Sequence, residues 1–147
     1  MGARVRLPIL LHADDARWIM RPDPAIELWE GEERQLGDGL TLVRLGGHFA
    51  GGTVLHVDRA DGLLLTGDII QVIPDREHVA FMYSYPNLIP LAEREVRTIA
   101  TKLKPYRFER ILGAWWNRIV PRDGHEIVQR SAERHARAVR GQYPPGA

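Results

Sequence analysis

The sequence contains no cysteine among its 147 residues. Disulfide bonds, thiolate metal sites and cysteine nucleophiles are therefore excluded. An excess of one charge is also lacking, because 20 basic residues are balanced by 19 acidic ones, for a formal net charge of +1. Nucleic acids and anionic membranes attract proteins with a large basic surface, so this balance predicts neither partner.

Long apolar runs are absent as well. No stretch of 18 apolar residues occurs, and the run Leu7–Leu11 is too short for a signal peptide, so we expect a soluble, cytoplasmic protein. Hydrophobic residues make up 44% and charged residues 27% of the chain, which are ordinary globular values. The length predicts one domain over residues 1–141, followed by a flexible tail at 142–147.

The hydrophobic pattern predicts strands and helices in mixed order. Apolar residues favour strands at 5–11, 40–45, 53–58, 62–66 and 108–114, and the charged stretch 29–36 is compatible with an edge strand. Helices are predicted at 14–20, 90–104 and 123–141, the last starting with a capping box of Asp123 and Glu126. Residues 69–89 follow neither period and predict a long loop. Strands with interspersed helices indicate an α/β layered domain.

Without cysteine, any metal must be bound by histidine, aspartate or glutamate, and the sequence has six histidines. His48 lies on a glycine-flanked turn between two predicted strands, and Asp68 follows a third strand and Gly67. Rigid scaffolds often carry functional groups at strand ends, and these two side chains are ligand types that zinc accepts. From the residues alone, a hydrogen-bonded loop histidine and an aspartate that caps a turn remain the alternative.

The order Gly-Gly-His-Phe-Ala-Gly-Gly-Thr, strand, Leu-Leu-Leu-Thr-Gly-Asp resembles the middle motifs of the metallo-β-lactamase-fold hydrolases. The resemblance implies part of an αββα sandwich, with a mixed sheet flanked by helices. It also implies metal-dependent hydrolysis of an ester, thioester, amide or phosphoester, with zinc or another divalent metal as the cofactor. In that family His48 would bind the first metal, and Asp68 would bridge two metals in the catalytic centre.

Two family motifs are missing. The His-x-His-x-Asp-His signature does not occur, and the place of the family's last histidine reads Ala-Trp-Trp-Asn at 114–117. We therefore expect a chain that is N-terminally truncated relative to the family, weakly active or inactive, and without stoichiometric zinc at micromolar metal. His125 is a candidate for a displaced third ligand, with an exposed position in a first helical turn as the alternative.

The loop tyrosines and the paired tryptophans are candidates for a pocket, and the remaining histidines are interpreted as structural or solvated. Tyr83 and Tyr85 of the long loop, with Trp115 and Trp116, are candidates to line a substrate pocket beside Asp68, and packing is the alternative. The remaining histidines are interpreted as structural or solvated: packing for His56 and His135, loop positions for His12 and His78.

Three function classes follow. The first is the metal-dependent hydrolase. The second is a non-catalytic module on the same fold that binds a small molecule or a protein through the aromatic loop. The third is a structural subunit that completes its fold with another chain. A missing half would expose apolar sheet surface and a strand edge, so we expect a homodimer through the first strand or the open sheet face.

Overall fold

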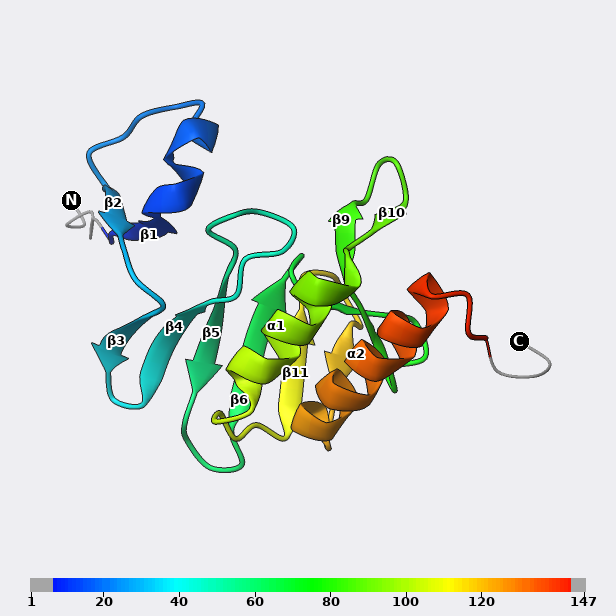
Figure 1. Ribbon diagram of the computed structural model, residues 1–147. Helices are drawn as coiled ribbons and strands as arrows, with labels where there is room; N and C mark the ends of the chain where they lie inside the picture. The colour runs from blue at the N-terminus through cyan, green and yellow to red at the C-terminus, as the bar shows by residue number, and fades with distance from the viewer. Residues whose placement is uncertain (1–6, 144–147) are drawn as a thin grey trace.

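The structure is a computed structural model that describes residues 7–143. Its centre is a six-stranded mixed sheet in the order β12-β11-β6-β5-β4-β3 (Figure 1). The strands of this sheet are β3 (Glu33–Gly37), β4 (Leu40–Arg44), β5 (Thr53–Val57), β6 (Leu63–Gly67), β11 (Arg110–Gly113) and β12 (Ile119–Val120). Neighbouring strands are antiparallel except β6 and β11, which run parallel.

Strands β3 to β6 form an antiparallel meander, and the strands predicted at 40–45, 53–58 and 62–66 are confirmed as β4, β5 and β6. The turn between β5 and β6 contains Asp61 and Gly62. Gly62 has a φ of +80° in this turn, and a Cβ there would lie 2.3 Å from the carbonyl oxygen of Arg107. Only glycine satisfies both conditions. Glycine is therefore required in this turn, both by its left-handed backbone conformation and by the segment that passes beside it on the way into β11.

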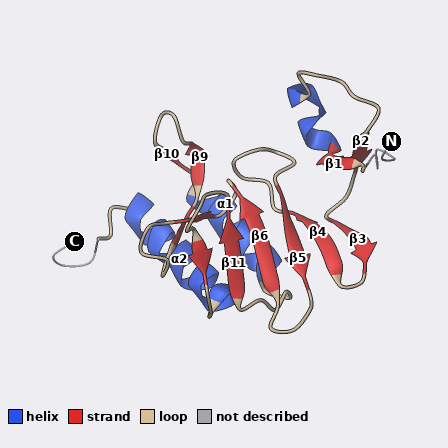
Figure 2. Ribbon diagram, turned by 180° about the vertical axis from the view of Figure 1, so that it is seen from behind, coloured by secondary structure: helices blue, strands red, loops and turns tan. Residues whose placement is uncertain are grey.

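Two helices, α1 (Glu93–Leu103) and α2 (Gly124–Val139), lie on one face of the sheet (Figures 1 and 2). Each helix buries one apolar stripe; that of α1 comprises Val96, Ile99, Ala100 and Leu103. These side chains pack against the sheet residues of one hydrophobic core, among them Val43, Val54, Leu64 and Ile111. The helices predicted at 90–104 and 123–141 are thus confirmed, with α1 and α2 each presenting an apolar stripe to the sheet.

The start of α2 corrects one expectation. Asp123 has a left-handed φ of 57° and its side chain makes no cap hydrogen bond, so the predicted capping box is wrong. The N–H groups of Gly124 and His125 instead donate to the carbonyl oxygens of Glu109 and Phe108, at 2.9 and 3.0 Å. The segment before β11 therefore satisfies the first helical donors, and a side-chain cap is not needed.

Short paired strands flank the main sheet. They are β1 (Ile9–His12) with β2 (Ile26–Trp29), β7 (Gln71–Val72) with β8 (Val79–Ala80), and β9 (Met82–Ser84) with β10 (Ile89–Pro90). The 3₁₀ helix η1 (Ala13–Trp18) connects β1 to β2. The expectation of an irregular segment at 69–89 is therefore wrong. Residues 5 and 6 of the first expected strand, and 144–147 of the expected tail, lie outside the described part.

The expected α/β αββα sandwich is wrong. Within residues 7–143 the fold is mainly β, with both α-helices on one face of the large sheet and no second large sheet against the other (Figure 2). That other face carries a half-buried row of leucines in register, which we call the leucine face: Leu42, Leu55, Leu65 and Leu112. Neither α-helix in this part of the chain has the length and apolarity needed to cross a bilayer.

Candidate functional site

His48 is held by the loop between β4 and β5. Gly46 and Gly47 have φ values of 72° and 87°, and a Cβ on Gly47 would lie 3.1 Å from the Ile99 side chain of α1. The glycines thus let the loop pass close to α1. His48 Nδ1 lies 3.0 Å from the carbonyl oxygen of Tyr83. Because that oxygen only accepts, Nδ1 carries the hydrogen in neutral His48, which leaves the lone pair of Nε2 available.

Asp68 lies directly after β6, at the same end of the sheet as the His48 loop (Figure 1). The hydroxyl of Tyr85 donates to the backbone oxygen of Asp68 at 2.8 Å. The Tyr85 ring also packs edge-on against His48, with 5.1 Å between ring centroids. His48 and Asp68, which are far apart in sequence, therefore contact the same tyrosine.

Tyr85 is a hydrogen-bond donor over the whole ordinary pH range. Partial burial, together with the negative charge of Asp68, raises the pKa of Tyr85 to about 12. Both effects disfavour the phenolate. The buried Thr66, at the end of β6, donates from Oγ1 to the carbonyl oxygen of Ile70 at 2.7 Å and so holds the turn that carries Asp68.

An open cavity of about 730 Å³ lies beside His48. Its walls are η1, the β4–β5 loop, the β9–β10 hairpin and α1. One wall is a row of aromatic rings, with 5.8 Å between the centroids of Trp18 and Phe49 and 4.8 Å between those of Phe49 and His48. Tyr83 also lines the cavity and its side chain is largely exposed, whereas Tyr85 and Asp68 are not among the lining residues.

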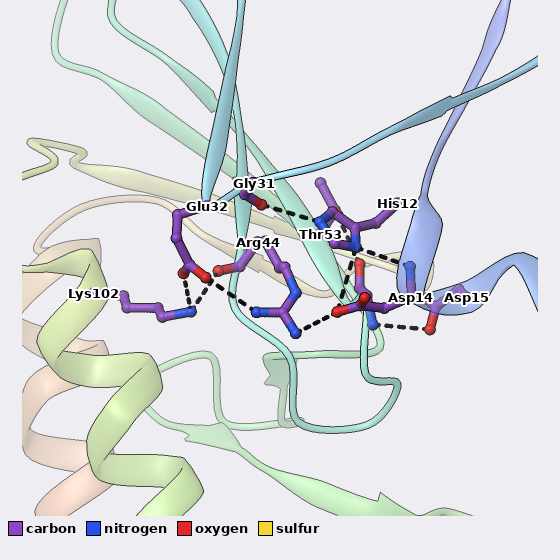
Figure 3. A network of polar contacts seen from close by, with 9 residues as sticks. His12, Asp14, Asp15, Gly31, Glu32, Arg44, Thr53 and Lys102 are labelled. Atoms are coloured by element: carbon purple, nitrogen blue, oxygen red, sulfur yellow. Dashed lines mark hydrogen bonds and ion pairs between the residues drawn. The ribbon is translucent and has the colours of Figure 1, made fainter.

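A polar network holds η1 against the rest of the site (Figure 3). The Arg44 guanidinium contacts Asp14 at 2.5 Å and Glu32 at 3.1 Å, and Lys102 of α1 pairs with the same Glu32. Asp15 accepts a 2.8 Å hydrogen bond from the N–H of Gly51. Three separate elements are thereby joined at the rim of the cavity.

The electrostatics of this network centre on Glu32. The hydrogen bond from Lys102 holds the pKa of the Glu32 carboxyl below its usual value, with further contributions from the charges of Lys102 and Arg44, while desolvation opposes them. Glu32 therefore stays ionised to lower pH than a free glutamate. Because both cations pair with it, neither Arg44 nor Lys102 carries a free positive charge toward the cavity.

The residues present do not fit a complete catalytic metal centre. Over residues 7–143, no three His, Asp or Glu side chains are grouped closely enough to hold one metal ion. A catalytic zinc ion takes three protein ligands and leaves one position open. Only two of the three expected ligands, His48 Nε2 and the Asp68 carboxylate, lie at the same end of the sheet.

The third expected ligand, His125, is at the opposite end of the sheet. Its backbone N–H bonds to Phe108, just before β11, and β11 runs parallel to β6 with Arg110 opposite Leu63. Asp68 follows the other end of β6, about five residues or roughly 16 Å away along the strand. The His125 ring packs on Phe108 with 5.5 Å between centroids. The structure does not bring this side chain to His48 and Asp68.

Trp115 and Trp116 are not in the cavity wall either. They lie in the turn between β11 and β12, and their exposed fractions are 64% and 96%. Sequence reasoning missed Arg17 and Trp18, which do line the cavity. The available signal was a cation next to an aromatic residue in the helix predicted at 14–20. No sequence pattern shows that this helix faces the His48 loop.

Histidines expected to be structural are hydrogen-bonded to carbonyl oxygens. Nε2 of His56 lies 2.8 Å from the carbonyl oxygen of Arg107. Nε2 of His135 lies 2.8 Å from the carbonyl oxygen of Leu91. His12 is buried as well, since its Nε2 lies 3.0 Å from the Gly31 carbonyl oxygen and its Nδ1 accepts from the N–H of Asp14. These interpretations are confirmed for His56 and His135, whereas His12 is more buried than a loop position suggests.

Comparison with known proteins gives one informative match. No protein-family model matches the chain. The uncharacterized protein YmaE of Bacillus subtilis (strain 168) is 50% identical over 135 residues, which cover 90% of this chain and 49% of YmaE. The chain thus spans about half the length of the curated relative it matches.

Proposed function

We propose that this chain carries part of the site of a metal-dependent hydrolase that resembles the metallo-β-lactamase-fold enzymes, acting on an ester, thioester, amide or phosphoester. The observation that carries the proposal is the shared contact with Tyr85. His48 and Asp68 were chosen from the motif alone, and both lie against this one side chain.

The surroundings of His48 support a functional role. Its Nδ1 hydrogen is bound by a backbone oxygen, which orients the ring and leaves Nε2 as the free nitrogen. His48 and Asp68 would supply two ligands to a metal ion, and Lewis-acid chemistry there would require a third ligand. The described residues offer two donors, so we propose that this chain alone is at most weakly active.

A second candidate is the non-catalytic binding module. The observation that favours it is the cavity of about 730 Å³ with its wall of aromatic rings, which needs no metal to hold a ligand. In this alternative the same pocket binds a small molecule without converting it.

Zinc titration of the purified chain by calorimetry tests the first proposal. We expect no stoichiometric binding at micromolar zinc, and weak binding at higher concentration that the substitutions His48→Ala and Asp68→Asn both abolish. His78→Ala is the matched control, because His78 pairs with Asp75 in a separate loop. Zinc binding that survives both site substitutions would refute the proposal. Hydrolysis of 4-nitrophenyl acetate and bis(4-nitrophenyl) phosphate, measured with zinc present, should be barely above background.

A further inference from the structure

We infer that the cavity beside His48 binds an anionic ligand with a flat apolar group, whose charge pairs with Arg17 and whose flat group packs on Trp18 and Phe49. The inference rests on the proposed function in taking this cavity as the substrate site. It adds the charge and shape of the ligand, which neither the motif nor the relative specifies. It applies equally to the hydrolase and to the binding module.

The aromatic wall supplies the apolar part of the argument. Trp18 and Phe49 are 53% and 42% exposed, although both have large apolar rings. They come from different elements, η1 and the β4–β5 loop, and meet edge to face at the cavity wall. A flat group laid on these rings would remove apolar surface from water, and it would gain the preferred contacts of aromatic rings.

The charges around the cavity favour an anion, and they place it near η1. The cations in the wall are Arg17, Arg44 and Lys102, and the last two are paired with Asp14 and Glu32. Arg17 makes no ion pair with any carboxylate of residues 7–143, and its guanidinium carbon lies 4.9 Å from the centre of the Trp18 ring. Arg17 is therefore the cation left for a ligand.

The opposite wall rejects negative charge. Glu95 of α1 lines the cavity and has no partner cation in the described part of the chain. Like charges in a shared cavity repel each other. An anion therefore binds at the η1 side, where Arg17 and the aromatic wall are adjacent. The polar network around Arg44 holds η1 in this position.

The test uses 2-naphthoate and its uncharged analogue 2-naphthalenemethanol. Binding is followed by the indole N–H signals of the four tryptophans, with EDTA present so that no metal takes part. We expect naphthoate to shift the Trp18 signal and to leave the signals of Trp115 and Trp116 unchanged. We also expect it to bind more tightly than the alcohol, because an exposed charge pair contributes up to about fivefold in affinity.

Substitution separates the charge from the apolar contact. Arg17→Gln should weaken naphthoate binding about fivefold and leave the alcohol unaffected. Arg122→Gln is the control, since Arg122 is exposed and lies outside this cavity. Equal affinities of acid and alcohol for the unchanged chain, or shifts at Trp116 without a shift at Trp18, would overturn the inference. Both outcomes are independent of zinc binding, so they are distinct from a failure of the proposed function.

Discussion

Replacing Tyr85 with phenylalanine tests the contact on which the candidate site depends. The substitution removes the hydroxyl that donates to the Asp68 backbone oxygen at 2.8 Å, but it keeps the ring against His48. Asp68 is exposed, so water can replace the lost donor. A hydrogen bond of this kind contributes about 1 kcal/mol to the free energy of unfolding, and we expect Tyr85→Phe to cost this much or less at pH 7.

The pH dependence gives a sharper test. The pKa of Tyr85 is raised to about 12 from its ordinary value of 10.0. The neutral phenol therefore stabilises the fold fully below pH 10, and this contribution is lost as pH rises toward 12. Two pH units correspond to about 2.7 kcal/mol for a fully buried group, and we expect roughly 1 kcal/mol because Tyr85 is only half-buried.

Urea unfolding at pH 7, 10 and 11.5 measures both effects, and absorbance at 295 nm follows tyrosinate formation. Tyr85→Phe should remove one tyrosine that ionises near pH 12. It should also reduce the fall in unfolding free energy between pH 10 and pH 11.5. Tyr106→Phe is the matched control, because burial, with its hydrogen bond to Glu33, also raises the pKa of Tyr106 to about 12 at a distance from the site. Unchanged late titration in Tyr85→Phe would refute the assigned contact.

Three further predictions concern the network, a turn and the leucine face. Glu32→Gln should lower the unfolding free energy by less than about 1 kcal/mol at pH 7. The difference in stability between the two proteins, measured by urea unfolding at several pH values, should vanish as pH falls through the lowered pKa of Glu32. Gly62→Ala should lower the unfolding free energy, measured in urea, by about 3 kcal/mol or more, because the new Cβ would collide with backbone atoms. Gly31→Ala should lower it by about 1 kcal/mol, because no atom lies within 4 Å of the new Cβ, and equal losses would contradict this reasoning. We expect the chain to form a homodimer through the leucine face, so light scattering should give twice 16.7 kDa, and Leu65→Lys should give the monomer mass; a monomeric parent chain would contradict this.

Local features of the chain were predictable, and the arrangement of layers was not. Strands β4 to β6 were predictable from their apolar residues, and each pairs with its neighbour in sequence. Whether a second large sheet covers the leucine face depends on contacts between segments that are far apart in the sequence. A local sequence pattern does not predict such contacts. The strands of two or three residues at 71–90 are too short for a period to be detected.

The candidate site shows the same division. His48 and Asp68 were found because glycine spacing and strand ends are local signals. Arg17 and Trp18 were missed because η1 reaches the cavity through the Arg44–Asp14 pair, a contact between residues far apart in the chain. Asp123 fitted a capping pattern, yet the carbonyl oxygens of Glu109 and Phe108 already accept from the first helical N–H groups.

The parallel pairing of β6 with β11 has a consequence for the order of folding. The meander from β3 to β6 pairs strands that are neighbours in sequence, whereas β11 reaches β6 only after the chain has passed through β7 to β10 and α1. Closing so long a loop costs entropy before any contact compensates for it. We expect the meander to be formed in the transition state, so that Val54→Ala mainly slows folding, while Ile111→Val at the late strand mainly accelerates unfolding. The end of the sheet that carries Asp68 would then become rigid last, when β11 docks beside β6.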